Sequence, residues 1–301
     1  MMQYRFDPVY NCEMCDAPSE KHKIVGQRLN TSQGLRPKSK KGISVSVQKC
    51  SNCGLLYSNP QPIPFDIGDH YGIPPESYWS TSYFTWDEKY FVNQIQTFKK
   101  LARFEPGMKA LDIGAGIGKC MKSLEAAGFD AYGFEPSEPF YERAISKMNI
   151  SPERLKLGQA ENVEYEDETF DFITFGAVFE HLYHPRQSLQ KALGWLKKGG
   201  IIHIEVPSSK HLMASVIDTF YKIRGTNYTT HLSPMHSPFH MYEFDIRSFE
   251  ELSEKLGYRI VHKEYMVGSV RNFPTILHPI FKWIMKSTNR GLQLIVWLEK
   301  K

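Results

Sequence analysis

The second two-thirds of the chain alternates short apolar runs with longer segments whose apolar residues recur at helical spacing. The apolar runs occupy residues 109–113, 131–134, 170–175 and 201–206. The longer segments include residues 118–127, 138–148 and 185–197. Strands that alternate with helices are joined by crossover connections, which place the strands parallel to one another. The pattern therefore predicts a parallel sheet with helices on both of its faces.

The pattern changes beyond the fourth apolar run. Residues 244–258, FDIRSFEELSEKLGY, have the apolar spacing of a helix, and residues 258–266 and 291–301 have the pattern of two further strands. The apolar stretch 275–301 is interrupted by Lys286–Arg290. It therefore predicts a helix followed by a strand rather than a membrane anchor.

The first third of the chain divides into two regions. Residues 1–60 contain two β-like runs, at 21–29 and 42–50. The following region begins with a proline-rich segment, which we expect to be an extended connector, and continues into a helix that ends at Gly107. The apolar positions of that helix are Phe91, Ile95, Phe98 and Leu101 or Ala102. We expect three units in the chain, namely residues 1–60, 61–107 and 108–301.

The composition is that of a folded protein large enough for one α/β domain and a smaller appendage. Its 301 residues are 41% hydrophobic and 23% charged, and the formal net charge is +4. So small a charge suits an acidic small molecule or a weak nucleic-acid contact and does not decide between them. We find neither the apolar run of a signal peptide nor a membrane-spanning stretch, and we expect a cytoplasmic protein without a membrane partner. The sequence leaves the oligomeric state open.

The stretch LDIGAGIGKC combines the end of a strand with a glycine-rich turn. A dinucleotide fingerprint, G-x-G-x-x-G, would need glycine where this chain has Lys119. The observed order is Asp112-x-Gly114-x-Gly116-x-Gly118, and an acidic residue before the glycines suits a ligand with a cationic end. A plain tight turn between a strand and a helix is the alternative that this loop alone leaves open.

This loop resembles motif I of class I S-adenosylmethionine-dependent methyltransferases. In that family the glycines let the backbone approach the methionine and ribose parts of the cofactor. The resemblance implies that S-adenosylmethionine contacts Asp112, Gly114, Ala115, Gly116 and Gly118. It also implies a Rossmann-like α/β sheet of seven strands in the order 3-2-1-4-5-7-6. Residues 291–301 would form the seventh strand, inserted antiparallel beside the fifth.

A second segment of the family pattern ends the next strand. The sequence AYGFEP places Glu135 and Pro136 at the carboxyl edge of the sheet, 17 residues after Gly118. A carboxylate at that position can accept hydrogen bonds from both ribose hydroxyls of the cofactor. A surface glutamate before a proline turn is the alternative.

Further segments follow in the order of the same family. The resemblance assigns Gln159, Ala160 and Glu161 to the adenine, although the family typically has Asp where this chain has Gln159. It assigns Phe175 and Gly176, at the end of the strand FDFITF, to a loop that faces the transferable methyl group. The later segment LKKGGIIHIEVPS matches the family's glycine turn and fifth strand.

The connector HYGIPPESYWSTSYF is a candidate lid over the cofactor. Its Tyr71, Tyr78 and Tyr83 are the aromatic residues that would contact the ligand. An aromatic stripe is more often used for packing than for a cofactor contact, so both interpretations stay open.

Four of the five cysteines form two pairs, Cys12-x-x-Cys15 and Cys50-x-x-Cys53, separated by 34 residues. Two such turns can each offer two thiolates to one tetrahedral Zn²⁺ ion. Redox-active pairs and reduced buried thiols are the alternatives. The fifth, Cys120, is expected to be a packing residue.

The segment around the second pair resembles the N-terminal zinc ribbon that precedes certain bacterial class I methyltransferases. Some members of that group modify sugars. The sugar C-methyltransferases among them carry a further C-terminal domain. We do not expect that domain in this chain, so their substrate is not carried over to it.

Methyl transfer from a sulfonium is an in-line displacement in which the protein aligns the acceptor and can remove one proton. A histidine is the natural base near neutral pH. The resemblance places Glu180 and His181 beside the methyl group, either as a base or as a pair that orients the loop. His240 matches a histidine that the family commonly has, and it is our first choice for acceptor binding or proton removal. The alternative is that His231, His236 and His240 only cap turns.

These features favour a methyltransferase whose acceptor is a small molecule, such as a sugar or another biosynthetic intermediate. One alternative is a nucleic-acid (RNA) methyltransferase that docks its substrate through the zinc ribbon. The sequence disfavours nucleic acid, because FGAVFEH replaces the Asn/Asp-Pro-Pro-aromatic motif of base-methylating enzymes and the ribbon has no dense basic and aromatic face. A non-catalytic protein that keeps the cofactor fold is the other alternative.

Overall fold

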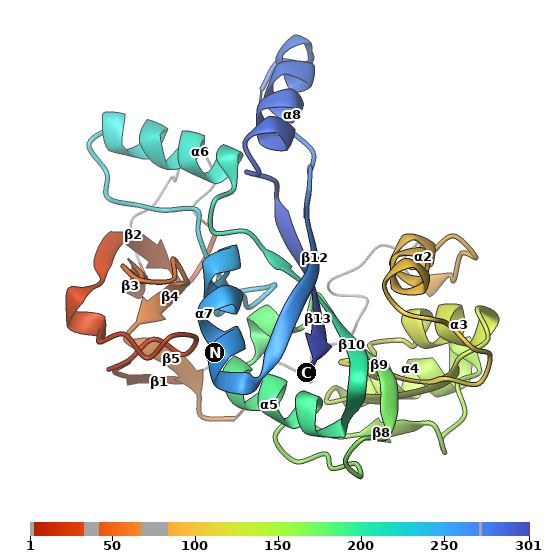
Figure 1. The fold of residues 1–301 in the computed structure, drawn as a ribbon. Coiled ribbons are helices and arrows are strands. Elements are labelled where there is room, and N and C mark those ends of the chain that lie inside the picture. The colour runs from red at the N-terminus through yellow and green to blue at the C-terminus, as the bar shows by residue number, and fades with distance from the viewer. Residues whose placement is uncertain (1–2, 33–41, 67, 69–83, 271–272) are drawn as a thin grey trace.

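The computed structural model describes residues 3–32, 42–66, 68, 84–270 and 273–301 (Figure 1). The predicted lid contacts Tyr71, Tyr78 and Tyr83 lie outside the described residues. In the part of the chain that is described, no helix combines the length and the apolar character needed to cross a membrane.

A seven-stranded sheet forms the centre of the protein (Figure 1). Its strands are β6 (Lys109–Ile113), β7 (Asp130–Glu135), β8 (Leu155–Leu157), β9 (Phe170–Gly176), β10 (Leu196–Pro207), β12 (Tyr258–Met266) and β13 (Gln293–Lys300). They lie in the order β8-β7-β6-β9-β10-β13-β12. The first five pair in parallel, whereas β13 pairs antiparallel with both β10 and β12. Numbered along the chain, the order is 3-2-1-4-5-7-6, which confirms the predicted sheet and its inserted antiparallel strand.

Helices cover both faces of this sheet, as the alternating pattern predicts. The helices α2 (Val92–Leu101), α3 (Lys119–Ala126) and α4 (Glu138–Met148) pack on one face. The helices α5 (Pro185–Trp195) and α7 (Ile246–Leu256) pack on the other (Figure 1). Because side chains alternate along a strand, Ala110 of β6 belongs to the core under α2–α4 and Leu111 to the opposite core.

Two further helices lie beyond this regular pattern. The sequence pattern did not predict α6 (Leu212–Ile223), which follows β10. The helix α8 (His278–Ser287) precedes β13, so the predicted helix followed by a strand is confirmed. The two helices share a small apolar cluster that includes Leu212, Met213 and Met285.

The helix before β6 ends earlier than predicted. It ends at Leu101, and Ala102 already has an extended backbone with φ −134° and ψ 152°. Pro106 disfavours helical backbone at the preceding Glu105. Gly107 instead takes a left-handed conformation, φ 87°, in the turn before β6. The prediction that the helix ends at Gly107 is therefore wrong.

The N-terminal part forms two small antiparallel sheets. In one, β2 (Lys23–Leu29), β3 (Ser44–Lys49) and β4 (Leu56–Asn59) are extended by β11 (Tyr242–Glu243). In the other, β1 (Tyr4–Asp7) pairs with β5 (Gln61–Pro64). The two predicted β-like runs are confirmed as β2 and β3. Since β11 comes from the loop before α7, the N-terminal sheet is hydrogen-bonded to the C-terminal part of the chain.

Replacement of Trp297 by alanine is expected to destabilise the protein strongly. Its side chain is fully buried, and its ring stacks on Phe172 with centroids 6.0 Å apart and contacts His203 at 4.7 Å. The cavity left by Trp297→Ala should cost about 3–5 kcal/mol in the free energy of unfolding, measured with urea. Trp283→Ala, at a position that is 70% exposed, is the matched control and should change it by less than about 0.5 kcal/mol. Equal losses in the two variants would contradict the described core.

Candidate active site

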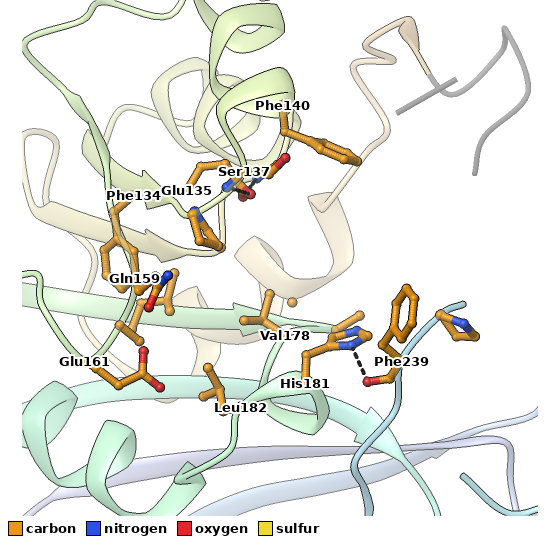
Figure 2. A pocket seen from close by; sticks show the side chains of 18 of the residues that line it. Phe134, Glu135, Ser137, Phe140, Gln159, Glu161, Val178, His181, Leu182 and Phe239 are labelled. Carbon is orange, nitrogen blue, oxygen red and sulfur yellow. Dashed lines mark hydrogen bonds between the residues drawn. The ribbon is translucent and has the colours of Figure 1, made fainter. Parts of the chain in front are cut away.

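A cavity of about 390 Å³ opens at the carboxyl edge of the central sheet (Figure 2). The loops that follow β6, β7, β8 and β9 line it, because the carboxyl ends of parallel strands meet at one edge. The sequence-predicted residues that line it are Gly114, Gly116, Glu135, Pro136, Gln159, Ala160, Glu161, Gly176 and His181. Segments far apart in the sequence thus converge on one site.

The glycine-rich loop after β6 forms one wall of the cavity. Gly114 and Gly118 have φ angles of 69° and 80°, a conformation that favours glycine. A Cβ at Gly114 would lie 2.6 Å from Val178 Cγ2, and a Cβ at Gly118 would lie 2.6 Å from Ile150 Cγ1. Both conformation and close packing therefore require glycine at these positions. The result is that backbone at Gly114 and Gly116 faces the cavity.

Four of the predicted cofactor contacts do not line the cavity. They are Asp112, Ala115, Gly118 and Phe175. Asp112 is 4% exposed, and its Oδ2 has no hydrogen-bond partner among the described residues. Burial, followed by the nearby Glu135 carboxylate, raises the pKa of Asp112 to about 8. Asp112 thus lies beneath the loop as a buried acid.

The Glu135 side chain is held in the cavity by two backbone N–H groups. The N–H of Gly116 donates to Oε2 at 2.7 Å, and the N–H of Ser137 donates to Oε1 at 2.9 Å. Burial raises the pKa of Glu135 to about 7, although these two hydrogen bonds act in the opposite direction. Each carboxylate oxygen keeps a lone pair for a ligand.

The segment after β8 forms a further part of the wall. Gln159, Ala160 and Glu161 line the cavity (Figure 2). The Lys191 ammonium group of α5 donates to the carbonyls of Ala160 at 3.3 Å, Glu161 at 3.0 Å and Val163 at 3.1 Å. A charged donor therefore fixes the backbone of the segment that the sequence assigns to the adenine.

Glu180, His181 and His240 come together at the edge of the cavity. Glu180 and His181 belong to the short 3-10 helix η4 (Phe179–His181) after β9. Glu180 Oε1 lies 3.9 Å from His181 Nε2 and 3.8 Å from His240 Nε2. Of the three, His181 lines the cavity, whereas Glu180 and His240 do not.

Burial controls the protonation of this group. It lowers the pKa of His181 to about 4 and that of His240 to about 3, and it raises the pKa of Glu180 to about 8. Both imidazoles are therefore neutral at neutral pH. His181 Nδ1 lies 3.2 Å from the carbonyl oxygen of Phe239, which can only accept. Nδ1 thus carries the hydrogen, and Nε2 has its lone pair free to accept.

The other two loop histidines have partners away from the cavity. His231 Nδ1 lies 2.5 Å from Glu243 Oε2, and His236 Nε2 lies 3.1 Å from Arg28 Nη2. Neither histidine lines the cavity. Of the three loop histidines considered from sequence, His240 is the one that approaches Glu180.

Several lining residues were missed by the sequence analysis. They are Tyr90, Ile113, Phe134, Ser137, Phe140, Ala177, Val178, Leu182, Pro238 and Phe239. Ser137 directly follows the predicted Pro136, and Ala177 directly follows the predicted Gly176. Their position next to predicted site residues could have identified them from sequence. Tyr90 precedes α2, and Phe239 belongs to a distant loop, and no local pattern connects either to the glycine-rich loop.

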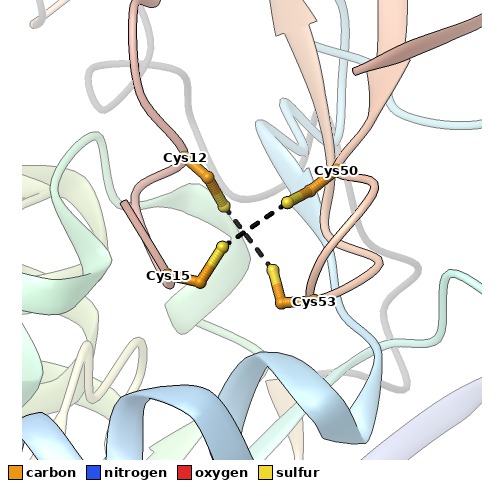
Figure 3. A group of neighbouring side chains, drawn as sticks. All are labelled: Cys12, Cys15, Cys50 and Cys53. Carbon is orange, nitrogen blue, oxygen red and sulfur yellow. Dashed lines mark hydrogen bonds between the residues drawn. The ribbon is translucent and has the colours of Figure 1, made fainter. Parts of the chain in front are cut away.

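The four paired cysteines converge in the N-terminal part (Figure 3). Their sulfur atoms all lie within 4.8 Å of one another, with Cys12 Sγ 3.5 Å from Cys53 Sγ and Cys15 Sγ 3.5 Å from Cys50 Sγ. All four are free thiols. Zn–S bonds of about 2.3 Å in a tetrahedron space the sulfurs at about 3.8 Å, so the arrangement fits a zinc ion. Cys120 lies apart in the core under α3, as predicted for a packing residue.

Comparisons with known proteins agree with this geometry. A family model described as a methyltransferase domain matches residues 86–263. The chain is 23% identical to the uncharacterized methyltransferase YcgJ of Bacillus subtilis (strain 168) over 187 residues, which cover 59% of this chain and 69% of that protein. It is 33% identical over 104 residues to the demethylmenaquinone methyltransferase of Bacillus mycoides (strain KBAB4). That match covers 32% of this chain and 43% of that relative, so it spans less than half of the relative's length.

A solved structure of YcgJ from Bacillus subtilis superposes with a TM-score of 0.48 at 16% identity, covering 69% of this chain and 99% of that one. The family model covers more than half of the 301 residues. The sheet order is the one that the family resemblance implies. Because the family model extends over more than half of its residues, the chain belongs to the class I S-adenosylmethionine-dependent methyltransferases.

Proposed function

We propose that this methyltransferase acts on a small-molecule acceptor, such as a sugar or another biosynthetic intermediate, that enters the cavity beside His181. The observation that carries the proposal is the shape of the cavity. One end is lined by Glu135, Ser137 and Phe140, and the other by His181 and Phe239 (Figure 2). Its volume of about 390 Å³ is that of a pocket for small ligands.

In this proposal the cofactor occupies the end at Glu135. The Glu135 carboxylate accepts hydrogen bonds from the ribose hydroxyls, and its two backbone donors keep it in place. The backbone of Gly114 and Gly116 approaches the methionine part. The Gln159 side chain accepts a hydrogen bond from the adenine amino group.

The acceptor atom forms its bond to the methyl carbon while the carbon–sulfur bond breaks, and the electron pair of that bond stays on sulfur. The protein contributes mainly alignment and exclusion of water. Because burial lowers the pKa of His181 to about 4, this imidazole is a weak base at neutral pH. We propose that its free Nε2 lone pair accepts a hydrogen bond from the acceptor, while Glu180 and His240 orient the ring.

We also propose a structural zinc ion at Cys12, Cys15, Cys50 and Cys53. Four thiolates complete a tetrahedral coordination shell, and such a closed shell leaves no position for a substrate. The ion would hold together two loops that are far apart in sequence. The proposal rests on the mutual sulfur distances and on the burial of all four side chains.

Replacement of Glu135 by glutamine is expected to weaken S-adenosylmethionine binding about ten- to a hundredfold, because the amide lacks the charge of the ribose acceptor. Wild-type affinity should also fall as the pH drops below about 7. Burial raises the pKa of Glu135 to about 7, and the protonated carboxyl that forms below this pH is the poorer acceptor. Isothermal titration calorimetry measures both effects.

The matched control is Glu138→Gln, which removes an exposed carboxylate three residues away, at the start of α4. This variant should bind S-adenosylmethionine with the affinity of the wild type, and its affinity should show the same pH dependence. Equal affinities of Glu135→Gln and wild type between about pH 6 and pH 8 would contradict the ribose assignment.

Freshly purified, unchelated protein is expected to contain about one zinc ion per chain by elemental analysis. Cys12→Ser should lose most of this zinc and should melt at a lower temperature, because metal binding contributes to folding. Cys120→Ser, which changes a buried cysteine outside the cluster, should retain it. Metal-free wild-type protein, or full zinc in Cys12→Ser, would refute the zinc site.

Incubation with methyl-labelled S-adenosylmethionine and fractionated metabolite extract should transfer label to a small molecule that mass spectrometry identifies. Glu135→Gln should transfer far less label at the same cofactor concentration, because it binds the cofactor more weakly. Label that enters RNA instead would favour the nucleic-acid alternative. Binding of the cofactor without transfer to any fraction would favour the non-catalytic alternative.

A further inference from the structure

The group formed by Glu180, His181 and His240 is a set of metal-ligand atoms. One carboxylate oxygen and two imidazole nitrogens lie within 4.8 Å of one another, and the two rings are 5.0 Å apart between centroids. Two histidines and one carboxylate are a common ligand set for divalent transition metals. Metal–ligand bonds of about 2.1 Å space the donor atoms at about 3–3.5 Å, so shifts of about 1 Å would close the site.

Glu180 is a buried acid with one carboxyl oxygen that the described residues leave without a partner. The residue is 2% exposed, and its Oε2 has no hydrogen-bond partner in the described part of the chain. Its nitrogen neighbours among the described residues are Nε2 of His181 at 3.9 Å and Nε2 of His240 at 3.8 Å, both beyond hydrogen-bond distance. A buried polar oxygen without a partner is costly, and a divalent cation between the three side chains would supply the missing partner.

Backbone hydrogen bonds hold the three side chains in this arrangement. The N–H of Met241 donates to the carbonyl of Glu180 at 2.9 Å, which joins η4 to the loop that carries His240. The N–H of His240 donates to Ser233 Oγ at 3.1 Å. His181 donates its Nδ1 hydrogen to the Phe239 carbonyl, the partner that metal-ligating histidines commonly use to direct the other nitrogen at the ion.

We propose that Glu180, His181 and His240 bind one divalent metal cation at the acceptor end of the cavity. Because His181 lines the cavity, a cation on its Nε2 lies at the edge that the substrate approaches. With the cation bound, the Nε2 lone pair ligates the metal, and the acceptor contacts the cation in place of the hydrogen bond to Nε2 described above. A cation there would orient and acidify a hydroxyl group, and in this proposal the acceptor atom is therefore a hydroxyl oxygen. The cation's role toward the acceptor rests on the proposed function. Metal binding by the three side chains does not depend on it.

Titration of the full chain with Mn²⁺ tests the site directly. Mn²⁺ is the probe because it prefers nitrogen and oxygen ligands, so the four cysteines compete poorly for it. The electron paramagnetic resonance signal of free Mn²⁺ should show about one ion bound per chain. Glu180→Gln and His181→Gln should each weaken binding about tenfold or more. Two variants are used because either one alone could fail to fold, which circular dichroism reports.

His236→Gln is the matched control, since it changes a histidine of the same loop outside the group, and it should bind Mn²⁺ like the wild type. Absence of Mn²⁺ binding to the wild type, or equal binding by wild type and folded variants, would overturn the metal site. S-adenosylmethionine titration of the same samples separates the two proposals. Cofactor binding without Mn²⁺ binding removes the metal site alone, and Mn²⁺ binding without cofactor binding removes the proposed function alone.

Discussion

Parallel pairing of β6 with β7 on one side and with β9 on the other is the constraint on which the site depends. Because these three strands run in one direction and in register, their carboxyl ends meet. The glycine-rich loop, Glu135 and the loop that begins at Gly176 are thereby brought to one place. Hydrogen bonds from the glycine-rich loop then connect it to the end of β7. The N–H of Gly116 donates to the Glu135 carboxylate, and the N–H of Gly114 donates to the backbone carbonyl of Phe134. The cavity therefore forms where the order of the parallel strands brings these loops together.

The N-terminal sheet supports the opposite side of the same cavity. Pairing of β11 with β4 holds the loop that carries Phe239 and His240. The Tyr242 hydroxyl accepts from Gln61 Nε2 at 3.1 Å and donates to the Tyr183 carbonyl at 3.0 Å. A zinc ion in the cysteine cluster would therefore influence the acceptor end through packing, without touching the substrate.

Most of the sheet and part of the cavity lining could be predicted from sequence, because buried parallel strands are apolar runs and the loops after β6 and β7 carry local motifs. The short strands β8 and β11 have too few residues for a periodic pattern. Phe239 reaches the cavity through long-range bonding between its loop and η4, which leaves no local signal. The family resemblance could rank His240 first, but burial, which lowers the pKa of His240 to about 3, depends on the tertiary fold.

A crystal structure of the protein grown with S-adenosylmethionine tests the central claim most directly. The account predicts the cofactor in the cavity with its ribose on the Glu135 carboxylate, its amino-acid part against the glycine-rich loop and its sulfonium directed toward His181. An empty cavity at saturating cofactor, or a cofactor bound elsewhere on the chain, would contradict the account.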